Sequence, residues 1–204
     1  MSDSIPVKFC FKGSRDYVQG GDIFNETIRI IKDKGECKSN LNVDLIMRNV
    51  LRTNADLFFV KKTDSNSDKL VNATINISCS TNQYEMILVE NNTPVDQRNE
   101  YYEEEIIKFI MYNEDEKSIS LEKCNHYTVI ERIIALNKVL LNRLFPNHGG
   151  KWYFVKIKLR NWDINMEDSA TIKLVFKKNM DFKLTDTIIY VEGEQVGNIY
   201  FSLI

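Results

Sequence analysis

The stretch "NHYTVIERIIALNKVLLNRLF", residues 125–145, is the longest helix signal in the sequence. Its apolar residues recur at helical spacing and cover most of the helix circumference. They are Val129, Ile130, Ile133, Ile134, Leu136, Val139, Leu140, Leu141 and Leu144. A helix that is apolar on nearly every side must be enclosed by other structure. We therefore predict a central helix over residues 125–145, ended by Pro146 and the Gly149–Gly150 pair.

Strand patterns surround this helix. Alternating apolar residues predict four strands after it, at residues 151–160, 171–177, 184–191 and 196–203. Before it, residues 104–112 predict a strand that 116–123 continues or pairs with. The three glutamates at 103–105 are expected to do no more than keep a strand edge soluble.

The first half of the chain has the same order of elements. Residues 6–12 predict a strand, 21–34 a helix that Gly35 ends, and 42–51, 55–61, 70–78 and 83–90 four further strands. The hairpin patterns of residues 71–90 and 184–203 can be superposed without a gap. We therefore predict two repeats, residues 1–92 and 101–204, joined by a linker at 93–100 within "NNTPVDQRNE". Two alternatives stay open, because all hairpins alternate with period two: a chance match, and two generic α+β domains.

Composition excludes several classes of protein. The chain has 204 residues, with 27 basic against 29 acidic ones and no basic cluster, so a nucleic-acid partner is not expected. No apolar stretch reaches the roughly 18 residues that cross a membrane, and no secretory signal pattern occurs at the start. We predict a soluble, cytoplasmic protein with no membrane partner.

The chemical motifs of metal and nucleotide enzymes are missing from the sequence. Cys10, Cys37, Cys79 and Cys124 are widely spaced, which favours buried free thiols over a zinc or redox site. No phosphate-binding glycine loop, zinc-binding histidine pair or serine-hydrolase motif occurs. We predict no metal and no cofactor.

The order of one strand, one helix and four strands resembles the hotdog fold of acyl-thioester enzymes. Two copies in one chain resemble a tandem double hotdog. The resemblance covers nearly the whole chain and rests on element order. It implies an α+β fold in which each of two repeats wraps an antiparallel sheet around a long helix.

A local resemblance concerns "RDYVQGGDIFN", residues 15–25, at the start of the first helix. Hotdog thioesterases of the 4-hydroxybenzoyl-CoA type carry a catalytic Asp and then a Gly-His-apolar-Asn-Asn turn into their central helix. Asp16 matches the catalytic acid, and Gly21, Ile23 and Asn25 match the turn. One extra residue separates the acid from the glycine, while Asp22 and Phe24 replace the His and an Asn. The strict motif is therefore absent.

Dehydratase hotdogs instead pair a His from one half with a carboxylate on the helix of the other half. By this resemblance, His126 could pair with Glu26 or Asp22. The predicted catalytic residues are thus Asp16, Asp22, Glu26 and His126, with Gly20, Gly21 and Asn25 binding substrate.

Each of these residues also has a structural interpretation. Asp22 suits a helix N-cap, and Gly20 with Gly21 suits a turn with positive φ. Asp16 could pair with Arg15 or Lys12. His126 with Asn125 could start the second helix. Aromatic residues near the strand at 151–160 could line an acyl pocket or belong to the core; they are Trp152, Tyr153, Phe154 and Trp162.

The resemblance implies an enzyme that hydrolyses or dehydrates an acyl thioester of CoA or of an acyl-carrier protein. In such hydrolysis, a carboxylate attacks or activates water while helix N-terminal amides hold the oxyanion. The alternative is a non-catalytic binding or scaffold protein of the same shape, because neither half holds a complete catalytic set. A homo-oligomer is left open.

Overall fold

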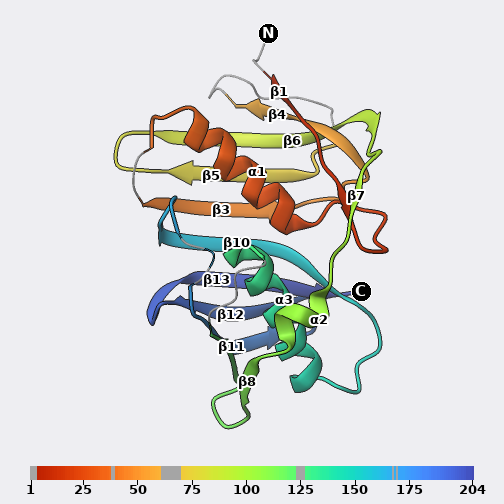
Figure 1. The fold of residues 1–204 in the computed structure, drawn as a ribbon, viewed down its shortest axis with the longest axis vertical. Coiled ribbons are helices and arrows are strands. Elements are labelled where there is room, and N and C mark those ends of the chain that lie inside the picture. The colour runs from red at the N-terminus through yellow and green to blue at the C-terminus, as the bar shows by residue number, and fades with distance from the viewer. Residues whose placement is uncertain (1–3, 38–39, 61–69, 123–126, 167, 169) are drawn as a thin grey trace.

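One antiparallel sheet of eleven strands is the frame of the molecule (Figure 1). The computed structural model describes residues 4–37, 40–60, 70–122, 127–166, 168 and 170–204. The strand order is β1-β4-β6-β5-β3-β10-β13-β12-β11-β9-β8. The strands of the first half are β1 (Ser4–Val7), β3 (Leu41–Met47), β4 (Thr53–Phe59), β5 (Ala73–Ser78) and β6 (Gln83–Pro94). Those of the second half are β8 (Ile110–Asn113), β9 (Ser118–Leu121), β10 (Trp152–Trp162), β11 (Ile172–Met180), β12 (Leu184–Val191) and β13 (Glu194–Leu203).

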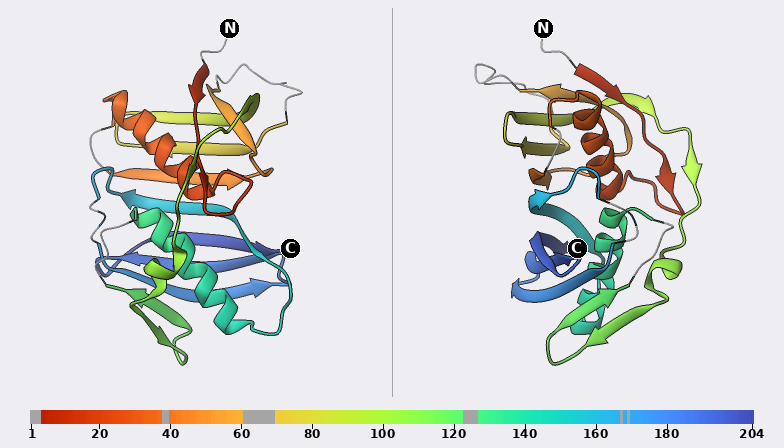
Figure 2. Two further views of the ribbon diagram at one scale, coloured as in Figure 1. Left: turned by 45° about the vertical axis from the view of Figure 1, so that its right-hand side comes forward. Right: turned by 60° about the vertical axis from the view of Figure 1, so that its left-hand side comes forward.

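Two long helices lie on the same face of this sheet (Figure 2). Helix α1 (Gly20–Asp33) covers the strands of the first half, and α3 (Val129–Leu144) covers those of the second. Ile23 and Ile31 of α1 and Ile133 and Leu140 of α3 are buried against the sheet. The prediction of an enclosed helix is confirmed for the described residues of α3, which starts at Val129 rather than 125.

The two halves meet at the pairing of β3 with β10. This pairing is antiparallel and sets Leu45 opposite Ile157. Both side chains are fully buried, so the apolar core continues across the junction. The N-terminal ends of α1 and α3 consequently lie beside one shared sheet.

The strands after each helix follow different orders. From the centre outward, the first half runs β3-β5-β6-β4 and the second runs β10-β13-β12-β11. The two hairpins that the sequence superposes also differ in their turns, because Ser78 pairs with Gln83 whereas Val191 pairs with Glu194. The superposition therefore reflects the alternation that hairpins share, and it does not establish a repeat.

The predicted strand at 104–112 is wrong in its first part. Residues Glu103–Ile107 form the short helix α2, and only Ile110–Asn113 form a strand, β8, which pairs with β9. Glutamates favour the first turn of a helix because they face its positive end. Ile106 is buried, and α2 packs beside α3.

The predicted linker takes part in the fold. Strand β6 continues through Pro94, and Arg98–Asn99 form β7, which pairs in parallel with β2 (Phe11–Lys12). In Figure 1 this segment runs down from β6 to α2 beside the loop that holds β2. The strand predicted at 6–12 is accordingly divided into β1 and β2. The division into residues 1–92 and 101–204 stays a prediction.

The cysteines correct the expectation of free thiols. Cys37, after α1, and Cys79, in the β5–β6 turn, form a disulfide with a Cα–Cα distance of 5.9 Å. Cys10 is free and half-buried, and Cys124 lies outside the described residues. Spacing along the chain misses such a pair because the fold brings the two positions together from 42 residues apart.

Candidate functional site

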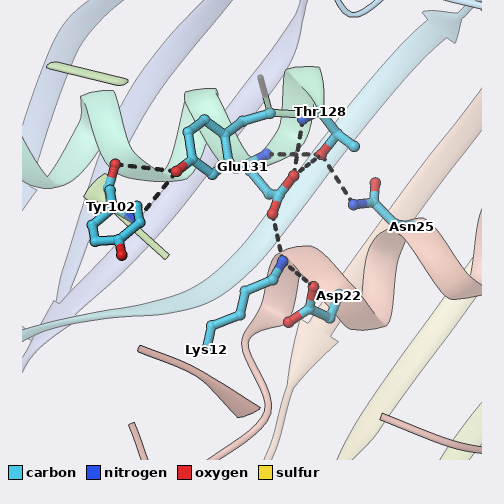
Figure 3. Close-up of polar contacts among 7 residues, drawn as sticks. Lys12, Asp22, Asn25, Tyr102, Thr128 and Glu131 are labelled. Carbon is cyan, nitrogen blue, oxygen red and sulfur yellow. Dashed lines mark hydrogen bonds and ion pairs between the residues drawn. The ribbon is translucent and has the colours of Figure 1, made fainter. Parts of the chain in front are cut away.

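An ion-pair cluster joins the first turns of the two long helices (Figure 3). The Lys12 ammonium on β2 forms ion pairs with Asp22 of α1 and Glu131 of α3. Glu131 also forms a capping box with Thr128, the N-cap of α3. The Asn25 amide donates to Thr128 Oγ1 at 3.0 Å. The predicted caps are therefore wrong: α1 follows Gln19, which makes no side-chain cap bond, and Thr128 replaces Asn125 and His126.

Burial and charge act in opposite directions on these three groups. Burial alone would lower the pKa of Lys12, but the carboxylates of Asp22 and Glu131 outweigh it and raise that pKa. Burial raises the pKa of Asp22, and Lys12 offsets this only in part. Burial would also raise the pKa of Glu131, but Lys12 and the bonds to Thr128 lower it overall. The cluster thus shifts the pKa values of its two carboxyls in opposite directions.

The glycine pair before Asp22 serves close packing rather than a turn. Neither Gly20 nor Gly21 has a positive φ. A Cβ on Gly20 would lie 2.2 Å from Cδ1 of Phe154, and one on Gly21 would lie 3.4 Å from Cδ1 of Ile134. The start of α1 therefore approaches β10 and α3 as closely as glycine allows.

Replacing Gly20 by alanine is expected to displace the Phe154 ring and lower the free energy of unfolding by about 1–3 kcal/mol, the usual cost of overpacking. Urea denaturation measures this change. Gly149→Ala is the matched control, because a Cβ there meets nothing within 4 Å. Equal stability of the two variants would contradict the close packing of Gly20 on Phe154.

An inner cavity of about 180 Å³ opens where α1 begins. Gln19 and Gly20 line it from α1, and Ile134 and Lys138 line it from α3. Its apolar surface comes from Val18, Met47, Val50, Trp152, Phe154, Val155 and Phe201. Trp152, Tyr153 and Phe154 thus line a cavity, as one interpretation of the sequence proposed, whereas Trp162 does not line this one. The positive end of α1 faces a mainly apolar chamber.

An outer cavity of about 580 Å³ adjoins the inner one and shares eight lining residues with it. The shared residues are Arg15, Tyr17, Val50, Tyr101, Glu103, Lys138, Trp152 and Tyr153. Arg52 and Lys151 also line the outer cavity. Its lining thus combines four cationic side chains with three carboxylates, those of Asp16, Glu103 and Glu104.

Glu103 is the carboxylate that lines both cavities. It accepts hydrogen bonds from Arg15 at 2.7 Å and from Lys138 at 2.9 Å. Arg15 lies 5.1 Å from the centre of the Tyr101 ring. Burial, followed by the charges of Glu103 and Glu131, raises the pKa of Tyr101. The Tyr101 hydroxyl therefore stays neutral, and Glu103 is held in place by two cations.

The predicted site residues do not meet at one point. Asp16 lines the outer cavity, with its side chain 80% exposed and 3.8 Å from Arg52 rather than paired with Arg15 or Lys12. Gly20 lines the inner cavity.

The other predicted residues lie elsewhere. Asp22, Asn25 and Glu26 line a third cavity of about 330 Å³ that shares no residue with the first two. Glu26 forms an ion pair with Arg29 at 2.5 Å. Gly21 packs against α3, and His126 lies outside the described residues.

Sequence reasoning missed Glu103, Lys138 and the role of Lys12. Two local patterns in the sequence could have indicated the helix starts that carry Glu103 and Glu131. Three glutamates before two isoleucines are typical of a helix start, and Thr128 with Glu131 follows the capping-box pattern. No local signal assigns Lys12 its partners, because Glu131 lies 119 residues away.

Two general searches of the described residues bear on the class of protein. Among them, no group of three or more His, Cys, Asp and Glu side chains is placed to hold a metal ion. None of the helices in this part of the chain has both the length and the apolar character to span a bilayer.

Solved structures similar to this chain include two dehydratase domains and a protein described as a thioesterase. No protein-family model and no curated protein matches the sequence. A monomeric dehydratase domain from a trans-AT polyketide synthase split module has a TM-score of 0.56 at 10% identity, over 99% of this chain and 100% of that one. The dehydratase domain of PpsC from Mycobacterium tuberculosis, solved with C12:1-CoA, has a TM-score of 0.55 at 6% identity, over 98% and 92%. A protein from Novosphingobium aromaticivorans described as a thioesterase has a TM-score of 0.52 at 8% identity, over 98% and 94%.

Likeness at such low identity establishes the fold alone. The structural similarity to these neighbours extends over nearly the whole chain. The resemblance in the order of elements, seen in the sequence, has the same extent. A large antiparallel sheet with its long helices on one face is common to them and to this chain. The chain therefore has the hotdog α+β fold.

Proposed function

We propose that this protein binds an acyl group carried as a thioester on CoA or on an acyl-carrier protein, and hydrolyses the thioester. One observation carries the proposal: a mainly apolar cavity begins at the N-terminus of α1 and continues into a wider mouth, where Lys151 and three other cations lie among three carboxylates. An acyl chain suits the apolar part, and the phosphates of a pantetheine carrier suit the mouth. The hotdog neighbours, one of them solved with an acyl-CoA, support the same class of ligand.

The cavity offers groups for hydrolysis. The first backbone amides of α1, at Gly20 and Gly21, have no acceptor within the helix and can stabilise a developing oxyanion. Glu103 can activate a water molecule beside the thioester carbon. Arg15 and Lys138 hold this carboxylate in position. Hydrolysis is preferred to dehydration because Glu103, a carboxylate that can activate water, lines both cavities.

The same proposal treats residues 1–92 and 101–204 as two tandem hotdog-like repeats. Support comes from the β3–β10 junction and from one long helix on each half of the sheet. The strand orders of the two proposed units differ, since the first half runs β3-β5-β6-β4 and the second runs β10-β13-β12-β11. A single catalytic site at the α1 end follows, because α3 has a different residue set at its start.

Glu103→Gln is expected to lower thioester hydrolysis at least 100-fold, since a positioned base contributes roughly 10²–10⁴-fold. Release of free CoA thiol from acyl-CoA measures the rate. Glu105→Gln is the control, because Glu105 is exposed on the same helix and lines neither cavity. Asp16→Ala is expected to have a smaller effect, because that side chain is mostly exposed. Equal rates for Glu103→Gln and Glu105→Gln would remove Glu103 from the mechanism.

The second candidate function is non-catalytic binding of the same ligand. The ion pairs of Lys12 favour it, because they engage the carboxylates of both helix starts, Asp22 and Glu131. Binding of acyl-CoA without thiol release, in the wild type and in every variant, would support this candidate over the hydrolase. An Asp22→Ala variant is expected to change stability under either function.

A further inference from the structure

We propose that the inner cavity admits only a compact acyl group of about six carbon atoms, and that Phe154 sets this limit. The inference rests on the proposed binding of an acyl thioester and goes beyond it by naming the substrate class. It follows from the size of the cavity, from what forms its buried wall, and from how firmly its walls are held.

The size of the cavity sets the scale. A protein cavity of about 150 Å³ holds one benzene ring, which has six carbon atoms. The inner cavity measures about 180 Å³, so it has room for a group of similar size. A chain of twelve carbons is too large for this chamber alone.

Aromatic rings form the buried wall of the cavity. Phe201 is fully buried, and its ring centre lies 5.9 Å from that of Phe154 in an edge-to-face arrangement. A bulge in β10 shifts the register between Phe154 and Lys156. As a result, the consecutive residues Tyr153, Phe154 and Val155 all line the chamber. The bulge thus turns Phe154 toward the chamber, where it narrows the space beside Gly20.

The walls cannot easily give way. Phe154 lies against Gly20 so closely that a single added carbon would overlap its ring. On the opposite side, Ile134 of α3 packs against Gly21. Since densely packed side chains move only at a cost, the cavity is expected to keep its size when ligand binds.

A series of S-alkyl-CoA thioethers tests the limit, because these probes cannot be hydrolysed. Isothermal titration calorimetry gives the dissociation constant for butyl, hexyl, octyl and dodecyl chains, with free CoA as the reference. Each buried methylene is expected to improve binding about fourfold up to hexyl. Beyond hexyl we expect no further gain, and dodecyl is expected to bind at least tenfold more weakly than hexyl.

Phe154→Ala is expected to move the optimum to octyl or longer. Phe59→Ala is the matched control, because Phe59 on β4 lines none of the described cavities. Ile134→Ala, which enlarges the chamber from the α3 side, provides a second test if Phe154→Ala does not fold. Thermal unfolding of each variant establishes that it is folded.

The outcomes separate this inference from the proposed function. If no chain binds better than free CoA, the acyl-binding function fails, and the length limit fails with it. If affinity keeps rising through dodecyl, acyl binding stands and the limit is overturned. An unchanged optimum in both Phe154→Ala and Ile134→Ala would also overturn the role assigned to Phe154.

Discussion

Lys12→Met is expected to lower the free energy of unfolding by about 3–5 kcal/mol, the usual effect of removing one partner of a buried ion pair. The Lys12 side chain is only 14% exposed, and it balances two carboxylates at once. Without it, Asp22 and Glu131 share a site with no cation between them. Asp22 Oδ2 already has no hydrogen-bond partner. Urea or thermal denaturation at pH 7.5 measures the loss.

Two further variants control this experiment. Lys173→Met breaks the exposed pair with Glu116, at 2.7 Å, and is expected to change the free energy of unfolding little, because water screens this pair. Adding Asp22→Asn and Glu131→Gln to Lys12→Met removes the unbalanced charges and is expected to restore much of the stability. If Lys12→Met were no more destabilising than Lys173→Met, the cluster would not hold the two helix starts together.

The loss in free energy of unfolding caused by Lys12→Met should also depend on pH. In the wild type the raised pKa of Asp22 adds stability below the ordinary Asp value of about 3.9, and this is lost as pH rises through the folded value. The lowered pKa of Glu131 has the opposite effect. It adds stability at pH values above the ordinary Glu pKa of about 4.3, and this stability is lost as pH falls through the pKa of Glu131 in the folded protein. Removing Lys12 raises the pKa of both Asp22 and Glu131 in the folded protein, because Lys12 lowers each of them. The loss caused by Lys12→Met is therefore expected to shrink from pH 7.5 to pH 5, where the carboxyls accept protons more readily.

Cys79→Ser is expected to lower the free energy of unfolding by about 4 kcal/mol. The Cys37–Cys79 bond closes a loop of 42 residues, and the entropy of closing a chain of that length in the unfolded state gives about 4 kcal/mol. For a chain of this size, that loss corresponds to a fall in Tm of roughly 10 °C. Thermal unfolding without reductant measures it. A reducing agent should lower the Tm of the wild type and leave that of Cys79→Ser unchanged.

Cys10→Ser is the control for the disulfide. Cys10 is free, and its thiol donates a weak hydrogen bond to Gln97 Oε1 at 3.4 Å, so its loss is expected to cost less than about 1 kcal/mol. Reductant-insensitive unfolding of the wild type would contradict the disulfide. Because disulfides are rare in cytosolic proteins, alkylation of the protein in cell extract also tests the predicted cytoplasmic location.

Much of the fold could be predicted from periodicity. Apolar spacing indicated α1, α3 and the main strands with small shifts at their ends, as for β12, predicted at 184–191 and observed as Leu184–Val191. Short segments were predicted less well. Residues 103–107 form a helix with three glutamates in its first turn, a local signal that the strand prediction overlooked, and the burial of Ile106 beside α3 supports this helix.

The candidate site could be predicted only in part. The glycines at the start of α1 were recognised as special, yet the reason is the Phe154 ring, which comes from a strand 134 residues further along. Asp16 was chosen from a motif, but it lies on the exposed rim. Glu103 was dismissed as a solubilising residue, yet it lines both cavities between two cations.

By itself, the sequence determined the α+β class, the two long helices and the order of elements that resembles a hotdog fold. These depend on spacings of two to four residues, which are local and visible in a single sequence. The tertiary structure alone decided the order of strands in the sheet, the disulfide, the Lys12 cluster and the position of the cavities. Each of these depends on residues that are distant along the chain and meet only when the sheet closes around both helices.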